Sequence, residues 1–232
     1  MYRYIDLIKV PIFSNLVIDF DSSNVPTGSV ANWVNLQNKF AGGSPNRDAV
    51  QATSAKQPVS TSNLKNGRNG LVFTAASLME LVSTFGISVS SDCTMFAVYK
   101  LNSTPVNPNF SFVFDGIASS NRHGLLAGGS NGITSYRTNT YPGGGITTDT
   151  SNLVASGYGG TSGALYKNGV LQNAGAAGTN TLTGLRIGSR WDGASYPDMN
   201  LYQLIYYTRL LTEAERKAIE VYLGIKWGIT IS

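Results

Sequence analysis

Two short stretches of the sequence place aromatic rings beside planar polar side chains. GSRWDGASYPD begins at residue 188, and SYRTNTYPGGG begins at residue 135. Saccharide sites use aromatic faces beside planar hydrogen-bonding groups, on loops that a rigid scaffold carries. The candidate carbohydrate-binding residues are Arg190, Trp191, Asp192, Tyr196, Tyr136, Arg137 and Tyr141. The alternative interpretation is that these rings pack partly against the body of the domain.

Carboxylates spaced for glycan hydrolysis are scarce. A retaining glycosidase needs two carboxyl groups about 5–5.5 Å apart, which on one strand means acidic residues two or four positions apart. Asp19 and Asp21 have this spacing, but Asp21 opens the turn DSSN, and we interpret it as a solvated turn residue. Three of the four glutamates lie within 213–220, a predicted helix. A catalytic pair of carboxylates contributed by two different strands remains an alternative.

The remaining reactive side chains form no recognisable centre. Cys93 is the one cysteine and lies in the apolar run CTMFAVYK, so we interpret it as a buried thiol. A reactive thiol would need a nearby base, and nothing in the sequence pairs Cys93 with His123, the one histidine. The sequence has no His/Cys cluster for a transition metal, no G-x-S-x-G elbow and no phosphate loop. We therefore expect no cofactor.

Length and charge bound the class of protein. The 232 residues suit one large all-β domain. The net charge is +4 without any basic run, so we expect no nucleic-acid partner. The N-terminal stretch has no long apolar core, and no segment approaches the roughly 18 apolar residues of a spanning helix. We expect no membrane span and no export signal, as in a cytoplasmic protein or one released by lysis.

Short strand patterns separated by turn residues predict a sandwich or barrel. The expected strands are 15–20, 70–75, 93–101, 110–116, 123–129, 132–138, 184–189 and 200–207, with a hairpin over 162–172. Asn168-Gly169 supplies the two positive-φ positions of a type I′ turn in that hairpin. We interpret the glycine-rich stretch 140–163 as a long surface loop or weak strands.

A helix is predicted near the C-terminus. Thr212 and Glu215 form a capping box, and Glu213 adds negative charge at the positive end of the helix dipole. Gly228 ends the pattern as a C-terminal cap. The expected apolar face comprises Ala218, Ile219, Tyr222, Leu223, Ile225 or Lys226, with Trp227 beside it. This face must pack on the sandwich, and we expect Trp33 and Trp227 to be core or seam residues.

The segment YYTRLLTEAERKAIEVYLGIKWGI, residues 206–229, contains the pattern Y-x-R-x-L-T-x-x-E-R followed by Y-L-x-x-K-W-G. It resembles the ending of concanavalin A-like lectin/glucanase domains, the laminin-G-like jelly rolls of bacterial surface proteins and phage virion proteins. Weaker matches follow in the same order upstream, including LVIDFDSSNV, LYKNGVLQ and LRIGSRWDG. The family often has an acidic residue where this chain has Gln203. The resemblance implies an all-β antiparallel sandwich over residues 15–232, with one C-terminal helix packed on it.

The resemblance also implies a choice of activities. Laminarinase-like relatives carry E-x-D-x-x-E, which this sequence lacks, so we expect a protein that is not an enzyme. Some laminin-G-like domains bind calcium, but Asp149, Asp192 and Asp198 are too few to predict a site for an ion that takes six to eight oxygens.

Two functional hypotheses remain. The first is a phage or virus structural protein located in the virion, such as a capsid decoration, fibre or tail component, with possible glycan binding. Its partners would be other virion proteins and copies of itself. Residues 1–14 would be an assembly arm or a peripheral strand, and its candidate contact residues are Tyr2, Tyr4, Ile5 and Leu7. The alternative is a carbohydrate-binding module or adhesin domain at the bacterial surface or outside the cell.

Overall fold

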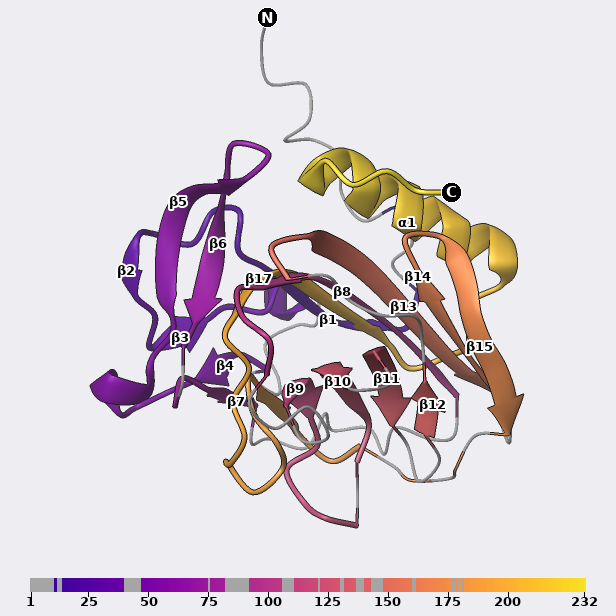
Figure 1. The fold of residues 1–232 in the computed structure, drawn as a ribbon, viewed down its shortest axis with the longest axis horizontal. Coiled ribbons are helices and arrows are strands. Elements are labelled where there is room, and N and C mark those ends of the chain that lie inside the picture. The colour runs from indigo at the N-terminus through magenta and orange to yellow at the C-terminus, as the bar shows by residue number, and fades with distance from the viewer. Residues whose placement is uncertain are drawn as a thin grey trace, which may run out of the picture.

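The computed structural model describes residues 11, 14–39, 47–74, 76–81, 92–105, 111–120, 122–129, 132–136, 140–142, 148–159, 162–176, 178, 180 and 182–232. In this part of the chain the strands form two stacked antiparallel sheets, and helix α1 (Glu213–Trp227) lies on the outer face of the larger sheet (Figure 1). The predicted antiparallel β-sandwich with a C-terminal helix is therefore confirmed. No described helix is both long and apolar enough to cross a bilayer.

The larger sheet has the strand order β15-β14-β13-β8-β17-β6-β5-β2. Strand β6 pairs with the first part of β17, and β1 pairs with the remainder of the same edge. The strands are β1 Leu16–Asp21, β2 Gly28–Ser29, β5 Val59–Lys65, β6 Arg68–Phe73, β8 Cys93–Leu101, β13 Ser151–Gly159, β14 Ser162–Lys167, β15 Val170–Ala176 and β17 Met199–Tyr207.

The smaller sheet has the order β12-β11-β10-β9-β16-β7-β4-β3. Its strands are β3 Asn32–Trp33, β4 Ala49–Val50, β7 Met79–Leu81, β9 Phe112–Asp115, β10 Gly124–Gly129, β11 Gly132–Tyr136, β12 Thr140–Pro142 and β16 Leu185–Ile187. Two short 3-10 helices, η2 (Leu36–Lys39) and η3 (Ser54–Lys56), lie in the connections between strands.

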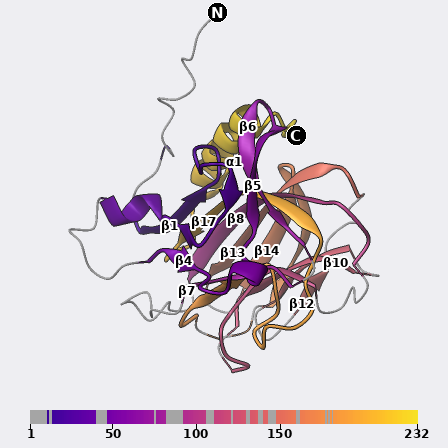
Figure 2. The same ribbon diagram turned by 90° about the vertical axis from the view of Figure 1, so that its left-hand side faces the viewer.

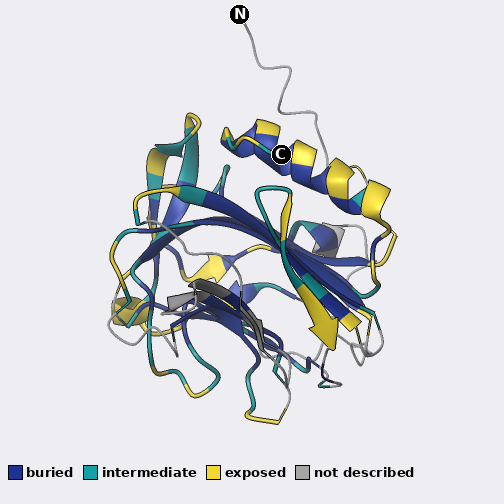
Figure 3. Cartoon of the chain, turned by 45° about the vertical axis from the view of Figure 1, so that its right-hand side comes forward, coloured by how far each residue is buried: buried dark blue, intermediate teal, exposed yellow. Residues whose placement is uncertain are grey.

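Strand β8 has an almost continuously apolar sequence because both of its faces are buried. Met95, Ala97 and Tyr99 pack in the core between the two sheets, whereas Phe96 and Val98 pack in a second layer beneath α1. Successive side chains of a strand point to opposite faces, so a strand covered on both faces needs apolar residues at every position. Figure 3 shows the result, with buried residues in both sheets and on the inner side of the helix.

One predicted loop is a strand. The sequence interpretation left 140–163 as a long loop or weak strands, but β13 runs for nine residues and pairs with both β8 and β14. Of the two alternatives, the strand is therefore confirmed for residues 151–159, and the surface loop is wrong there. Leu153, Val154 and Tyr158 are buried in this strand, and its many small residues hid the strand pattern. The predicted turn at Asn168-Gly169 is confirmed, since both residues have positive φ.

The ends of α1 are as predicted. The Thr212 side chain accepts from the Glu215 amide, the Glu215 carboxylate accepts from the Thr212 amide, and Gly228 caps the C-terminus in the left-handed conformation. Asn66, in the turn of the β5–β6 hairpin, donates to the Lys226 carbonyl at 2.9 Å. This bond satisfies a carbonyl that the helix leaves free, and it fastens the hairpin beside the end of α1 (Figure 2).

The buried face of α1 differs in part from the prediction. Ile219, Tyr222, Leu223 and Trp227 are buried as expected. Of the alternatives Ile225 and Lys226, Lys226 is the buried one, whereas Ala218 faces solvent. Further charged residues lie on the inner side: Arg216 and Glu220 form a buried ion pair. The guanidinium of Arg216 also lies 3.7 Å from the centre of the Tyr166 ring. Charge pairing and ring stacking permit this burial, and an apolarity pattern does not reveal either of them. Trp33 and Trp227 are core residues, as predicted.

A polar network joins the last turn of α1 to the larger sheet. Lys226 forms an ion pair with Asp21 and donates to Gln203 Oε1 at 2.9 Å. Trp227 Nε1 donates to the same oxygen at 3.0 Å, and Gln203 Nε2 donates to Asp19 Oδ1 at 2.7 Å. The interpretation of Asp21 as a solvated turn residue is therefore wrong, because it is the counter-ion of a buried lysine. Burial and the charge of Asp21 raise the pKa of Asp19 to about 6.

Candidate functional site

The strongest candidate surface is the loop between β16 and β17, residues 188–198, called here the Trp191 loop. The Arg190 amide donates to the Ala194 carbonyl at 3.0 Å, and the Gly193 amide donates back to the Arg190 carbonyl at 2.9 Å. Gly193 and Ser195 have φ of 74° and 59°, which is the conformation such tight turns require. The loop is thus compact and internally hydrogen-bonded around Trp191.

Two charged residues of the smaller sheet hold the backbone of Trp191. Its amide donates to Asp115 Oδ2 at 3.1 Å, and its carbonyl accepts from Arg186 Nη1. Asp115 is fully buried. Arg122 donates two hydrogen bonds to it, from Nε to Oδ1 at 3.0 Å and from Nη2 to Oδ2 at 2.6 Å. Burial raises the pKa of Asp115, while the Arg122 fork acts against the rise. The position of Trp191 is therefore set through its main chain, which leaves its side chain free of this task.

These anchors belong to a row of residues across the smaller sheet. The register places Arg186 of β16 opposite both Glu80 of β7 and Asp115 of β9. Arg186 Nη2 lies 2.5 Å from Glu80 Oε1. The sequence analysis missed all of these residues. Arg186 between the buried Leu185 and Ile187 is a usable signal of an outward-facing polar position, but its cross-strand partners are not readable from one sequence.

The side chains of the Trp191 loop meet the chemical expectation for a saccharide surface. Trp191 is partly exposed, and the Arg190 guanidinium lies 5.9 Å from its ring centre. Arg190 Nε donates to Asp192 Oδ1 at 2.9 Å, and this hydrogen bond lowers the pKa of Asp192 to about 2. Tyr196 donates its hydroxyl to the Gly193 carbonyl. The structure thus brings four predicted residues together as one indole beside a planar guanidinium–carboxylate pair.

The second predicted group is described only in part. The backbones of Tyr136 and Tyr141 lie on β11 and β12, and Arg137 lies outside the described residues. Tyr136 pairs with Gly124, and a Cβ at Gly124 would come 3.1 Å from Asp115 Oδ1. The register therefore places position 136 in the row that holds the Trp191 loop. The predicted assembly residues Tyr2, Tyr4, Ile5 and Leu7 lie outside the described residues.

The structure pairs two residues that the sequence left apart. Cys93 Sγ lies 3.6 Å from His123 Nδ1, which is also hydrogen-bonded to the Tyr206 hydroxyl at 2.8 Å. His123 Nε2 lies 2.7 Å from the Asn180 carbonyl and donates to it, because a carbonyl oxygen can only accept. Cys93 and His123 have no exposed surface. The pair therefore fills the core and does not face a substrate.

The three aspartates weighed for calcium lie apart. Asp192 pairs with Arg190, Asp149 pairs with Lys100 at 3.1 Å, and Asp198 accepts from Asn102 at 2.9 Å. Within the described ranges, no group of three or more His, Cys, Asp or Glu residues gathers to hold a metal ion.

Solved structures share this fold. Domain 4 of AbnA, a GH43 extracellular arabinanase from Geobacillus stearothermophilus in complex with arabinotriose, is 16% identical with a TM-score of 0.60, over 89% of this chain and 98% of that one. Trypanosoma rangeli sialidase in complex with sialic acid is 15% identical with a TM-score of 0.60, over 97% and 35%. A mutant GH54 α-L-arabinofuranosidase is 12% identical with a TM-score of 0.62, over 84% and 50%.

This likeness is one of fold, at low identity. The chain spans nearly all of the arabinanase domain but about a third of the sialidase chain. No protein-family model matches the sequence, and no curated protein matches it. The β-sandwich is thus one that occurs in solved structures of glycoside hydrolases.

One prediction is overturned by these comparisons. We expected a protein that is not an enzyme because E-x-D-x-x-E is missing, yet the neighbouring structures are an arabinanase, a sialidase and an arabinofuranosidase. That expectation is wrong. A motif on a single strand is one way to present two carboxylates, and a sandwich can bring them together from different strands.

Proposed function

We propose that this chain is a saccharide-binding β-sandwich domain that takes its ligand at the Trp191 loop. The observation that carries the proposal is the way Trp191 is held. Its backbone is fixed by Asp115 and Arg186, while the residue stays partly exposed. The proposal also draws support from the fold, which the arabinanase and sialidase structures share.

The chemistry of the loop suits a sugar ring. The C–H face of a sugar is apolar and packs on an aromatic ring, while its hydroxyls both donate and accept hydrogen bonds. Arg190 offers donors and Asp192 offers acceptors beside the indole. Because the loop is already ordered by its own hydrogen bonds, binding would not need to order it first, and preorganisation of this kind favours affinity.

Tryptophan fluorescence provides a direct test. The chain has three tryptophans, and Trp33 and Trp227 are buried at 1% and 0% exposure. Acrylamide should therefore quench mainly Trp191. We expect a bound glycan to shield Trp191 and lower the quenching constant. Arabinotriose and sialic acid, the ligands of the neighbouring structures, are the first probes, followed by a glycan array.

A Trp191→Ala variant completes the test. It should lose glycan binding but keep its melting temperature, because the anchoring bonds use the main chain of residue 191. Leu171→Ala, at an exposed position on β15, is the control and should bind as the native chain does. An array without signal above background, or full binding by Trp191→Ala, would refute the proposal.

We further propose a setting for this binding. The resemblance of residues 206–229 to concanavalin A-like domains supports a phage or virus particle component, such as a decoration, fibre or tail protein that assembles with copies of itself. The alternative is a carbohydrate-binding module or adhesin domain at the bacterial surface. Many copies of the chain in purified particles would favour the first setting. A protein that stays monomeric at high concentration and is absent from particles would exclude it.

A further inference from the structure

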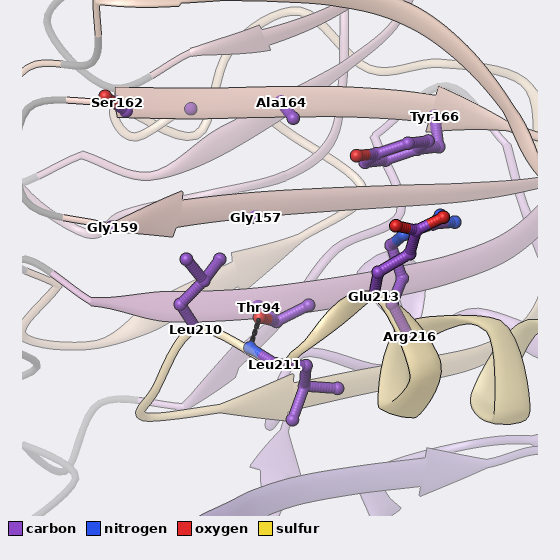
Figure 4. A pocket seen from close by; sticks show the side chains of 11 residues that line it. Thr94, Gly157, Gly159, Ser162, Ala164, Tyr166, Leu210, Leu211, Glu213 and Arg216 are labelled. Atoms are coloured by element: carbon purple, nitrogen blue, oxygen red, sulfur yellow. Dashed lines mark hydrogen bonds between the residues drawn. The ribbon is translucent and has the colours of Figure 1, made fainter.

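A pocket of about 230 Å³ opens on the outer face of the larger sheet, beside the first turn of α1 (Figure 4). It lies over β13 and β14, whereas the Trp191 loop connects β16 to β17 and is anchored on Asp115 and Arg186 of the smaller sheet. It is smaller than the roughly 300–1,000 Å³ of pockets that enclose a drug-sized ligand. Its size therefore suits a single ring.

The floor of the pocket is made of residues without bulky side chains. Gly157 and Gly159 of β13 and Gly163 and Ala164 of β14 line the pocket on the side of the sheet. Leu210 forms one wall. A Cβ would come 3.0 Å from Leu210 Cδ1 at Gly157 and 2.7 Å from Leu210 Cδ2 at Gly159, so the two glycines make room for Leu210, whose side chain is exposed above them. The floor and wall together offer a flat apolar surface.

Polar groups stand at the ends of this apolar surface. Tyr166 closes one end, and its hydroxyl points along β14 toward Ala164 (Figure 4). Ser162 lies at the other end. Within the described part of the chain, neither hydroxyl takes part in a hydrogen bond between protein groups, so both can bond to a ligand. Thr94 accepts from the Leu211 amide at 2.9 Å and donates to the Arg209 carbonyl at 3.0 Å, which fixes the wall.

The charges around the pocket balance. Arg216 pairs with Glu220, and Glu213 pairs with Lys217 at 2.7 Å. The guanidinium of Arg216 also lies against the ring of Tyr166. The charged side chains among the described residues of the pocket are therefore paired and leave no net charge to attract an ionic ligand. A purely apolar ligand would cover the Tyr166 hydroxyl without replacing its bond to water, which disfavours it.

We infer that this pocket is a second saccharide site, which binds one neutral sugar ring independently of the Trp191 loop. The C–H face of the ring lies on Leu210 and Ala164, and its hydroxyls reach Tyr166 and Ser162. The inference rests on the proposed function only in the class of ligand, because the two sites share no residue.

The test uses the full chain and amide NMR. L-arabinose and D-galactose are the neutral probes, and N-acetylneuraminic acid is an anionic probe. We expect the neutral sugars to shift the amide signals of Gly159 and Gly163 saturably at millimolar concentration. N-acetylneuraminic acid should leave both signals in place. Equal shifts by the anionic sugar would refute the selection for neutral ligands, and no shift by either neutral sugar would refute the site.

Variants separate this site from the Trp191 loop. Tyr166→Phe removes one hydroxyl but keeps the ring against Arg216, and it should weaken binding about fivefold, the effect of one hydrogen bond. Ala164→Leu should fill the pocket and abolish the shifts, whereas Ile225→Ala, on the exposed side of α1, should change nothing. Native affinity in Tyr166→Phe would overturn the inference even if Ala164→Leu failed to fold. Trp191→Ala should leave the shifts intact, so each proposal can fail alone.

Discussion

Replacing Asp19 by asparagine should stabilise the protein at neutral pH. Asp19 is 4% exposed and shares its buried cluster with Asp21 and Lys226. Two carboxylates and one ammonium group leave one surplus negative charge beneath α1. Asparagine resembles the protonated aspartate, and its oxygen can still accept from Gln203 as Asp19 Oδ1 does at 2.7 Å.

The size and sign of the effect follow from the pKa. Burial, reinforced by Asp21, raises the pKa of Asp19 from its ordinary 3.8 to about 6. At pH values between the unfolded pKa of 3.8 and the folded pKa of about 6, the folded state binds more protons than the unfolded state. The free energy of unfolding therefore falls as the pH rises through this range. The difference between the two pKa values corresponds to about 3 kcal/mol in the free energy of unfolding. Asp19→Asn should therefore match the native chain near pH 4 and exceed it by up to about 3 kcal/mol above pH 7.

Urea unfolding followed by circular dichroism at several pH values between 4 and 8 measures this difference. Asp149→Asn is the matched control, because Asp149 has a side chain 75% exposed and forms a surface ion pair with Lys100. That variant should change stability by no more than about 0.5 kcal/mol. If Asp19→Asn were less stable than the native chain at pH 8, or if the difference were the same at pH 4 and pH 8, the reasoning would be refuted.

Two further predictions concern the packing of α1 and the buried thiol. Gly224→Ala would ordinarily stabilise a helix by about 1 kcal/mol, but its Cβ would come 2.8 Å from the Ile229 carbonyl oxygen and 2.6 Å from Ile231 Cγ1. We expect a loss of about 1–3 kcal/mol in urea unfolding, and a gain would contradict this packing. Cys93 is fully buried, so Ellman's reagent should label it only as the protein unfolds, and rapid labelling of the native state would show that the thiol is accessible.

The helix was predictable because its signals are local. The capping box at Thr212 and Glu215 and the stop at Gly228 depend on residues within one or two turns of each other. The strand β13 was harder to predict, since residues 151–159 include small and polar side chains that blur the pattern. Neighbouring strands cover β13 on both edges, and that context outweighs its weak local preference.

Only the exposed loop residues of the candidate site were predictable from the sequence, and the residues that anchor them were not. Arg190, Trp191, Asp192 and Tyr196 lie in one loop, so their proximity could be read from the sequence. Their support comes from Asp115, which lies 76 positions from Trp191. The ion pair of Asp21 with Lys226 likewise joins residues 205 positions apart. Contacts of this kind depend on strand register across the sheets, which no single sequence reveals.

The central position of β17 has a consequence for biosynthesis. This strand follows every other described strand along the chain, yet it lies between β8 on one side and β1 and β6 on the other. While a ribosome is still making the chain, those three strands have no shared neighbour, and their unpaired edges are open to aggregation and to chaperones. The larger sheet can close only after residues 199–207 have left the exit tunnel.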